Sequence, residues 1–153
     1  MPAVVEERID IAAPAATVWL VLADLAGWPT WNRSVRSVDR AGGGAPTVGE
    51  RVVVSQPRLP TTTWTVTEVE ERRSFTWVAT APGVRSVGEH ELVDRGPDGC
   101  TAVLRLTQHG PGGRLVALLY GRLTRRFVRW EAEGLKARAE GRPARPPADR
   151  SRP

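Results

Sequence analysis

His90, Ser86 and Tyr120 are the side chains best suited to acid–base chemistry in this chain of 153 residues. Residues 84–94 alternate as in a β-strand, and Ser86, Gly88 and His90 share one side of it. An imidazole on an otherwise apolar face can accept a proton, donate one, or hold a ligand through a hydrogen bond near neutral pH. A core histidine bonded to a backbone carbonyl is the plainer interpretation of His90, and both interpretations stay open.

Tryptophan supplies six of the aromatic residues, against one Tyr and two Phe, so the large apolar surfaces are concentrated at a few positions. On the inward side of the predicted strands, small residues such as Gly88 face Trp64 and Trp77, which leaves space beside an aromatic wall. These rings can stack on a planar ligand, pack as ordinary core, or do both with opposite faces. The predicted ligand contacts that share an inward position are Trp31, Trp64, Trp77, Gly88, Gln108, Leu119 and Leu123.

Two polar side chains are placed to meet a ligand near the ends of their elements. Tyr120, the only tyrosine, lies one position off the apolar stripe of the predicted C-terminal helix. Its hydroxyl would polarise a ligand carbonyl or phenol at a cavity mouth, or it lies in water while the ring packs at the edge of the stripe. Gln108 lies near the end of the last predicted strand and would orient a polar ligand group, or is simply solvated.

The elements that position these residues follow from hydrophobic periodicity. Short turn-forming clusters separate the predicted strands, so neighbouring strands are expected to be antiparallel. A helix is predicted over 14–25, a further helical turn over 29–32, and a long helix over 114–140. The seven predicted strands are 4–11, 35–40, 50–56, 62–70, 74–81, 84–94 and 101–109. A slip of one residue between the last two strands would turn His90 outward.

The long helix is predicted to cover the apolar face of the sheet, which gives an α+β fold. Residues at three- and four-residue steps form its apolar stripe. Arginines and the neighbouring Glu131 and Glu133 are interpreted as a solvated face. The predicted stripe consists of Leu115, Leu119, Leu123, Phe127, Trp130 and Gly134, and the arginines that avoid it are Arg122, Arg125, Arg126 and Arg129.

Composition excludes several classes of site. A single cysteine, Cys100, cannot form an internal disulfide or a thiolate metal site, and the two histidines are predicted on opposite faces. We therefore predict no metal, and no dinucleotide or other cofactor, because the glycines at 110–113 lack the phosphate-binding pattern.

The net charge of +5 is concentrated near the C-terminus, where four arginines and one aspartate follow Glu140. Residues 1–140 are predicted to form one domain, and 141–153 an Arg/Pro-rich disordered tail. We expect no specific binding to nucleic acid, because such a tail contacts phosphates without sequence preference. No apolar run is long enough to span a membrane and no signal sequence is recognised, so a cytoplasmic location is predicted.

Specific residues add a family resemblance over about 4–140. The segment from Ile9 to Trp19, followed by Asp24, Trp28-Pro29 and Trp31, resembles the opening of the polyketide cyclase/dehydrase branch of the START-like (SRPBCC) superfamily. Further matches to the same pattern are Val48-Gly49, Gly99-Cys100-Thr101 and Leu135-Lys136. The resemblance implies a helix-grip fold, in which a curved antiparallel sheet of seven strands wraps around the long C-terminal helix and leaves an elongated apolar cavity.

Two functions fit this resemblance. In the first, the cavity folds a poly-carbonyl or aromatic intermediate, and His90, Tyr120 and Ser86 assist proton transfer, as in a polyketide cyclase or aromatase. In the second, the chain is a non-catalytic carrier or sensor of a small hydrophobic molecule. The sequence does not decide between enzyme and binder, and it leaves a homodimer open.

Overall fold

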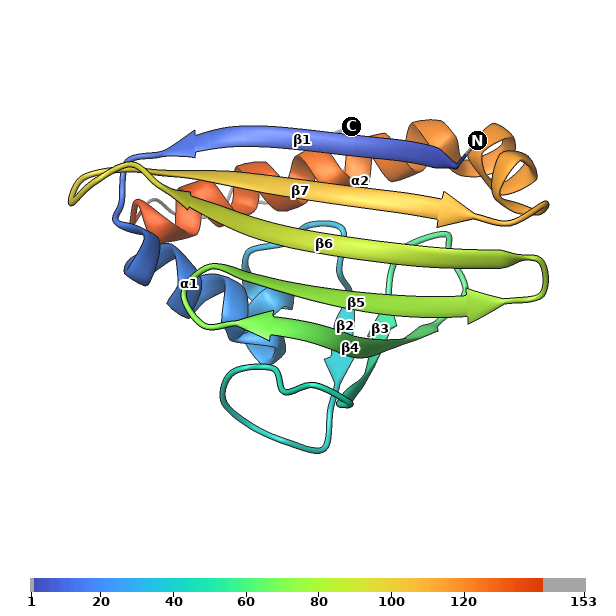
Figure 1. The fold of residues 1–153 in the computed structure, drawn as a ribbon, viewed down its shortest axis with the longest axis horizontal. Coiled ribbons are helices and arrows are strands. Elements are labelled where there is room, and N and C mark those ends of the chain that lie inside the picture. The colour runs from blue at the N-terminus through green and yellow to red at the C-terminus, as the bar shows by residue number, and fades with distance from the viewer. Residues whose placement is uncertain (1, 142–153) are drawn as a thin grey trace, which may run out of the picture.

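The computed structural model describes residues 2–141, where one curved antiparallel sheet is paired with a long helix (Figure 1). The strand order is β1-β7-β6-β5-β4-β3-β2. In chain order the elements are β1 (Ala3–Ile11), α1 (Ala15–Ala23), the 3-10 helix η1 (Leu25–Thr30), β2 (Ser37–Asp39), β3 (Arg51–Ser55), β4 (Thr62–Glu70), β5 (Ser74–Ala81), β6 (Val84–Asp94), β7 (Cys100–His109) and α2 (Gly113–Ala139). The predicted helix-grip architecture is confirmed, and the predicted tail lies outside the described residues apart from Gly141.

Strand register fixes which side chains of β6 face inward. β6 pairs with β7 so that His90 lies opposite Leu104, and with β5 so that His90 lies opposite Phe75. Gly88, His90 and Leu92 are buried. The alternation in β6 is therefore in the predicted phase, and His90 is on the inner face.

The core is densest where α1 and η1 pack against the sheet. Trp28, in η1, is only 2 % exposed, and its indole Nε1 donates a hydrogen bond to the carbonyl of Leu22 at 2.9 Å. Its ring lies 5.4 Å from that of Trp77 and 6.3 Å from that of Phe75, in tilted orientations. This aromatic cluster connects the first helices to the inner face of β5 and β6.

The carboxyl half of α2 is held tightly to the rest of the molecule. A Cβ built on Gly134 would lie 2.2 Å from the carbonyl oxygen of Trp31, so only glycine allows this close approach. Lys136 Nζ donates to the carbonyl of Asp10 at 2.6 Å, and Glu140 Oε2 accepts from the amide of Ala12 at 2.8 Å. These contacts attach the end of α2 to β1 and to Ala12, the residue that follows β1.

The amino half of α2 corrects the predicted stripe. Leu115, Leu118 and Leu119 are 59, 81 and 65 % exposed, so the predicted inward positions 115 and 119 face solvent. The inner face of this half consists instead of Val116, Tyr120 and Thr124. Because apolar residues occur all around these first turns, hydrophobic periodicity alone could not select the buried side.

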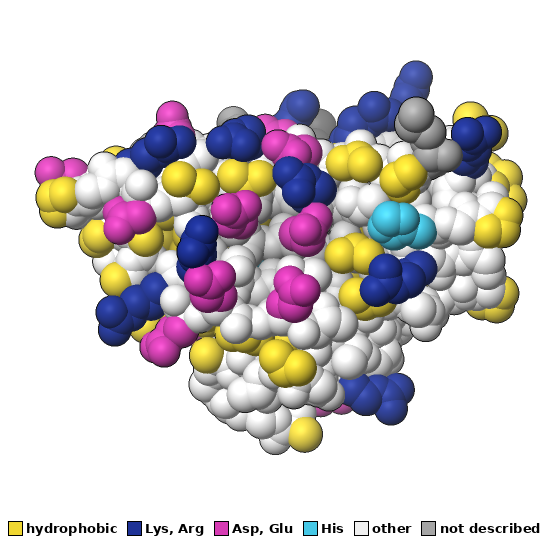
Figure 2. All heavy atoms as spheres, viewed as in Figure 1, with side chains coloured by type: hydrophobic (Ala, Val, Ile, Leu, Met, Phe, Trp, Pro, Cys, Tyr) yellow, Lys and Arg dark blue, Asp and Glu magenta, His cyan; other side chains and the backbone are white. Residues whose placement is uncertain are grey.

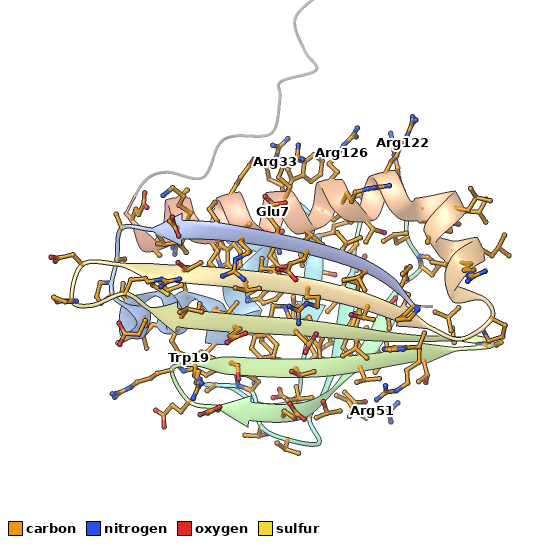
Figure 3. The ribbon with its side chains drawn as sticks, turned by 45° about the horizontal axis from the view of Figure 1, so that its top comes forward. Glu7, Trp19, Arg33, Arg51, Arg122 and Arg126 are labelled. Carbon is orange, nitrogen blue, oxygen red and sulfur yellow. The ribbon has the colours of Figure 1, made fainter. Side chains whose placement is uncertain are left out.

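The outer surfaces are mixed in charge. Figure 2 shows acidic and basic side chains interspersed over the face formed by β1, β7, β6 and β5. Arg105 contacts Glu6 at 2.9 Å and Glu89 at 3.5 Å, which links three strands. In Figure 3, Arg122 and Arg126 project from the outer side of α2. Among residues 2–141, no helix has the length and hydropathy that crossing a bilayer requires.

Trp130 is a third residue of the predicted stripe that lies away from the inner face, after Leu115 and Leu119. It is partly exposed, and the guanidinium of Arg33 lies over its ring, 4.3 Å from the centroid. Arg126 lies 6.0 Å from the same ring. The indole therefore forms cation–π contacts on the outer side of α2 and takes no part in the inner face.

Candidate functional site

A cavity of about 330 Å³ lies between the inner face of β4–β7 and α2. At its rim are exposed residues, among them Pro60, Thr80 and Tyr120. Its other end reaches buried residues, among them Asn32 and His90. Since a cavity of about 150 Å³ holds benzene, this volume suits a ligand of two or three fused rings.

Aromatic rings form one wall of the cavity. Trp64 and Trp77 are stacked, with centroids 5.3 Å apart and planes inclined by 27°. A Cβ on Gly88 would lie 2.5 Å from Trp77 Nε1, so the missing side chain lets the indole lie flat on β6. Ala79 and Ser86, paired across β5 and β6, also line the cavity with small side chains. The wall therefore leaves a slot for a planar molecule.

His90 is the most buried titratable residue of the cavity, with 4 % exposure. Its ring stacks on Phe75 at a centroid distance of 4.1 Å, and its Nδ1 lies 3.3 Å from the Phe75 carbonyl oxygen. Its Nε2 lies 3.5 Å from Oε1 of Glu131, a carboxylate on α2 that is 13 % exposed. Both partners of the predicted catalytic histidine are thus identified.

This geometry constrains where protons reside. A carbonyl oxygen only accepts, so the contact with Phe75 requires a hydrogen on His90 Nδ1. His90 Nε2 then faces Glu131 Oε1 at 3.5 Å, so an imidazole nitrogen and a carboxylate oxygen meet at the buried end of the cavity.

Glu131 corrects the expectation of a solvated carboxylate on the arginine-bearing face. It lies midway between Phe127 and Leu135 at four-residue steps, and both of these residues are buried. A carboxylate between apolar residues at four-residue steps was the signal in the sequence that could have predicted the inward position of Glu131. The predicted stripe followed Trp130 and Gly134 instead, which placed Glu131 outside it.

The three predicted catalytic residues all line the cavity but do not form one cluster. Ser86 is four strand residues from His90, or about 13 Å. Tyr120 is eleven helix residues from Glu131, or about 16 Å along the axis. Gln108 lies directly opposite Ser86 in the sheet. The polar groups therefore form two sets, with Ser86, Gln108 and Tyr120 toward the open end and the His90–Glu131 pair at the buried end.

Three predicted ligand contacts are absent from the lining of this cavity. Trp31 is buried in the core, between Trp28, whose ring is 5.4 Å away, and Gly134 of α2. Leu119 points to solvent, and Leu123 is only partly buried on a neighbouring part of the helix surface. The predicted contacts that do line the cavity are Trp64, Trp77, Gly88 and Gln108.

No metal site is assembled by the described part of the chain. Within residues 2–141, no group of three or more His, Cys, Asp or Glu side chains is arranged to hold an ion. Cys100 is a buried free thiol. Burial foremost, together with the nearby Asp94, raises the pKa of this thiol.

A curved antiparallel sheet that closes on a long helix, with an aromatic-lined cavity between them, is the helix-grip fold that START-like proteins have. The family model described as "Polyketide cyclase / dehydrase and lipid transport" matches residues 2–140. The chain belongs to this family. A search among curated proteins returned no significant match.

Solved structures share the fold at low sequence identity. The aromatase/cyclase Zhui from Streptomyces sp. R1128 superposes with a TM-score of 0.75 at 20 % identity, covering 92 % of this chain and 94 % of that one. A START superfamily protein from Mycobacterium smegmatis gives 0.68 at 19 %, covering 90 % and 97 %. Norcoclaurine synthase from Thalictrum flavum, in complex with dopamine and hydroxybenzaldehyde, gives 0.66 at 18 %, covering 89 % and 85 %.

Proposed function

We propose that the chain binds a small, planar, largely hydrophobic molecule in this cavity and catalyses a cyclase- or aromatase-type condensation on it. The observation that carries this proposal is the His90–Glu131 pair, 3.5 Å apart at the buried end of an aromatic slot. An apolar cavity supplies binding and excludes water, and a buried pair that holds one proton supplies acid–base chemistry. The description of the family names cyclases and dehydrases, which supports the same reaction class, and also lipid transport, which fits a carrier.

The reaction can be written with the pair acting first as base and then as acid. The pair lacking its shared proton removes one proton from a carbon that lies between two carbonyl groups. The resulting enolate carbon forms a bond to a third carbonyl of the same molecule, and the pair returns its proton to that oxygen, which becomes a hydroxyl. The pair then removes the second proton from the same carbon and delivers it to the hydroxyl, which leaves as water as a carbon–carbon double bond forms. In total one carbon–carbon bond forms, one water is released and no oxidant is consumed.

The relatives give a scale for the ligand. One solved neighbour is an aromatase/cyclase, and another was crystallised with dopamine and hydroxybenzaldehyde, which are single-ring aromatics. A volume of about 330 Å³ admits a two-ring aromatic with a short carbonyl side chain. We therefore choose 1-(2-naphthyl)butane-1,3-dione as a probe of both binding and proton removal.

The decisive experiment separates affinity from chemistry. Binding of the diketone is measured by titration calorimetry, and proton removal by NMR of deuterium uptake at the carbon between its carbonyls. We expect His90→Ala and Glu131→Gln to slow exchange by about 10²- to 10⁴-fold while affinity changes little. His109→Ala, outside the cavity lining, and Glu133→Gln, an exposed position on α2, are the matched controls.

A non-catalytic carrier or sensor is the second candidate. The contact of His90 Nδ1 with the Phe75 carbonyl favours it, because this is the ordinary way in which a core histidine is satisfied. If the wild-type chain binds the diketone but does not accelerate exchange, the carrier replaces the enzyme. Native mass spectrometry of the purified protein then identifies a co-purifying molecule.

The contribution of Tyr120 to ligand binding can be measured separately from proton transfer, because Tyr120 lies far from Glu131. We propose that its hydroxyl holds a polar ligand group near the open end, with Ser86 and Gln108 as neighbours on the cavity wall. Tyr120→Phe is expected to weaken diketone binding several-fold and to leave the exchange rate of the bound ligand unchanged. An equal loss of exchange rate in this variant would place Tyr120 in the proton transfer itself.

Cytoplasmic localisation and a homodimer stay predictions. Light scattering coupled to size-exclusion chromatography measures the mass in solution. A mass of one chain at micromolar concentration contradicts the homodimer.

A further inference from the structure

Asn32 is a buried polar residue at the closed end of the cavity, with 1 % exposure. Its backbone amide donates to the carbonyl of Trp28 at 2.7 Å, which fixes the residue directly after η1. Its side-chain oxygen Oδ1 accepts from the amide of Ser34 at 3.0 Å and from the Ser34 hydroxyl at 2.7 Å. The backbone amide of Ser34 can only donate, so the orientation of the Asn32 carboxamide is determined.

The other half of this carboxamide is unused. Among the residues that the structure describes, Asn32 Nδ2 has no hydrogen-bond partner, although it carries two N–H donors and is buried. Buried side-chain donors without a partner are uncommon in folded proteins, because burial removes their bonds to water. Ser34 holds the oxygen side of the group, so the nitrogen side remains for a molecule in the cavity that Asn32 lines.

Asn32 lines the same cavity as His90 and Glu131. Trp28, whose carbonyl anchors it, forms an edge-to-face contact with His90, and their ring centroids are 5.6 Å apart. On the other side, Gly134 of α2 lies against the carbonyl of Trp31, which brings the helical turn that carries Glu131 next to the segment containing Asn32. A donor, an imidazole and a carboxylate therefore surround one end of the slot.

We propose that Asn32 Nδ2 donates a hydrogen bond to a carbonyl or phenolic oxygen of the ligand. The ligand then enters the cavity with this oxygen leading. This inference rests on the proposed function for its ligand and specifies the substrate class as aromatic ketones and phenols. Hydrocarbons leave Nδ2 unpaired, and ammonium groups would place a donor against a donor. In an enolate, the same hydrogen bond stabilises the negative oxygen as His90 and Glu131 take the proton.

The test compares two ligands of nearly equal shape, 2-acetylnaphthalene and 2-isopropenylnaphthalene, which differ by a carbonyl oxygen in place of a methylene carbon. Both are titrated by quenching of tryptophan fluorescence. We expect the wild-type chain to prefer the ketone by about tenfold, as one well-formed hydrogen bond provides. Asn32→Asp keeps an oxygen for Ser34 and removes the donor, and it is expected to abolish this preference while hydrocarbon affinity stays within twofold. Glu133→Gln, at an exposed position of α2 outside the cavity lining, is the matched control and should keep the preference.

A second readout does not depend on a folded variant. In 15N-labelled wild-type protein, the side-chain amide signals of Asn32 should move on titration with the ketone and stay in place with the hydrocarbon. Equal affinity of the wild-type chain for both ligands, or unmoved Asn32 signals in the presence of bound ketone, overturns the inference and leaves the proposed function standing. Binding of neither naphthalene overturns both the inference and the proposed cavity function.

Discussion

Gly134→Ala tests how closely α2 must approach the core for the site to form. The added Cβ would lie 2.2 Å from the carbonyl oxygen of Trp31, whereas ordinary contacts of this kind begin at 3.4 Å. The obstructing atom belongs to the backbone, so a side-chain rotation cannot relieve the clash. The helix would have to move outward by about 1 Å, and overpacking of this kind costs about 1–3 kcal/mol.

The magnitude follows from two opposing effects. Alanine in a helix interior is about 1 kcal/mol more favourable than glycine. The distance from the added Cβ to the Trp31 carbonyl oxygen is more than 1 Å too short, and the oxygen is a backbone atom, so the cost belongs at the upper end of the overpacking range. We therefore expect the free energy of unfolding to fall by about 2 kcal/mol in total. For a chain of this size that corresponds to a fall in Tm of about 4–8 °C.

Gly121→Ala, earlier in the same helix, is the matched control. Its Cβ would meet only the end of the flexible Arg125 side chain, at 3.5 Å. This variant should gain up to about 1 kcal/mol from helix propensity. Urea unfolding followed by circular dichroism measures both variants. If Gly134→Ala is as stable as Gly121→Ala, the close crossing of α2 does not constrain the fold, and the reasoning about the position of Glu131 fails with it.

Three further perturbations probe other parts of the structure. Glu50→Gln breaks the ion pair of Glu50 with Arg40, in which the side chains are 11 and 5 % exposed and meet at 2.6 Å. It should lower the free energy of unfolding in urea by about 3–5 kcal/mol, because it leaves a buried charge unpaired. The double variant that also carries Arg40→Met should lose less. Burial raises the pKa of the Cys100 thiol above its usual 9.0, so the folded state holds this proton more tightly than the unfolded state. The free energy of unfolding should therefore decline above about pH 9. Cys100→Ala should remove this part of the decline when urea unfolding is compared at pH 8 and 10. Gly88→Ala would put a Cβ 2.5 Å from Trp77 Nε1 and push the indole into the slot, so diketone affinity in calorimetry should fall at least tenfold; unchanged affinity would mean that the ring does not border the ligand.

The sheet could be predicted from sequence because its signals are local. Alternation in β6 places His90 and Gly88 on one face, and short turns require antiparallel pairing. The register between β6 and β7 then confirms the inward side of His90. Periodicity of two thus located one member of the His90–Glu131 pair.

The helix side of the site could not be predicted in the same way. Leucines occur around the first turns of α2, so no single face was favoured there, and the stripe through Leu115 and Leu119 was wrong. The actual inner face is less apolar because Tyr120 and Thr124 border a space that larger apolar side chains would fill. Which side of a helix faces a cavity is a tertiary property.

Glu131 and Asn32 show the same limit for polar residues. Each looks like an ordinary surface residue in sequence. The fold brings Glu131 against His90 and places Asn32 in the lining of the same cavity. Trp31 shows the reverse case, since a large ring can be core without touching the cavity. Residue type predicts the chemistry available, whereas the packing of distant segments determines whether it is used.

The two halves of α2 are attached unequally to the rest of the molecule, and this determines which end of the cavity can open more easily. Beyond Phe127, the helix is fixed by the buried Leu135 and by the hydrogen bonds of Lys136 and Glu140 to β1. Its first turns bury little, so lifting them from the sheet disrupts few contacts. For the proposed ligand, we therefore expect entry past Tyr120, with the aromatic cluster around Trp28 staying assembled.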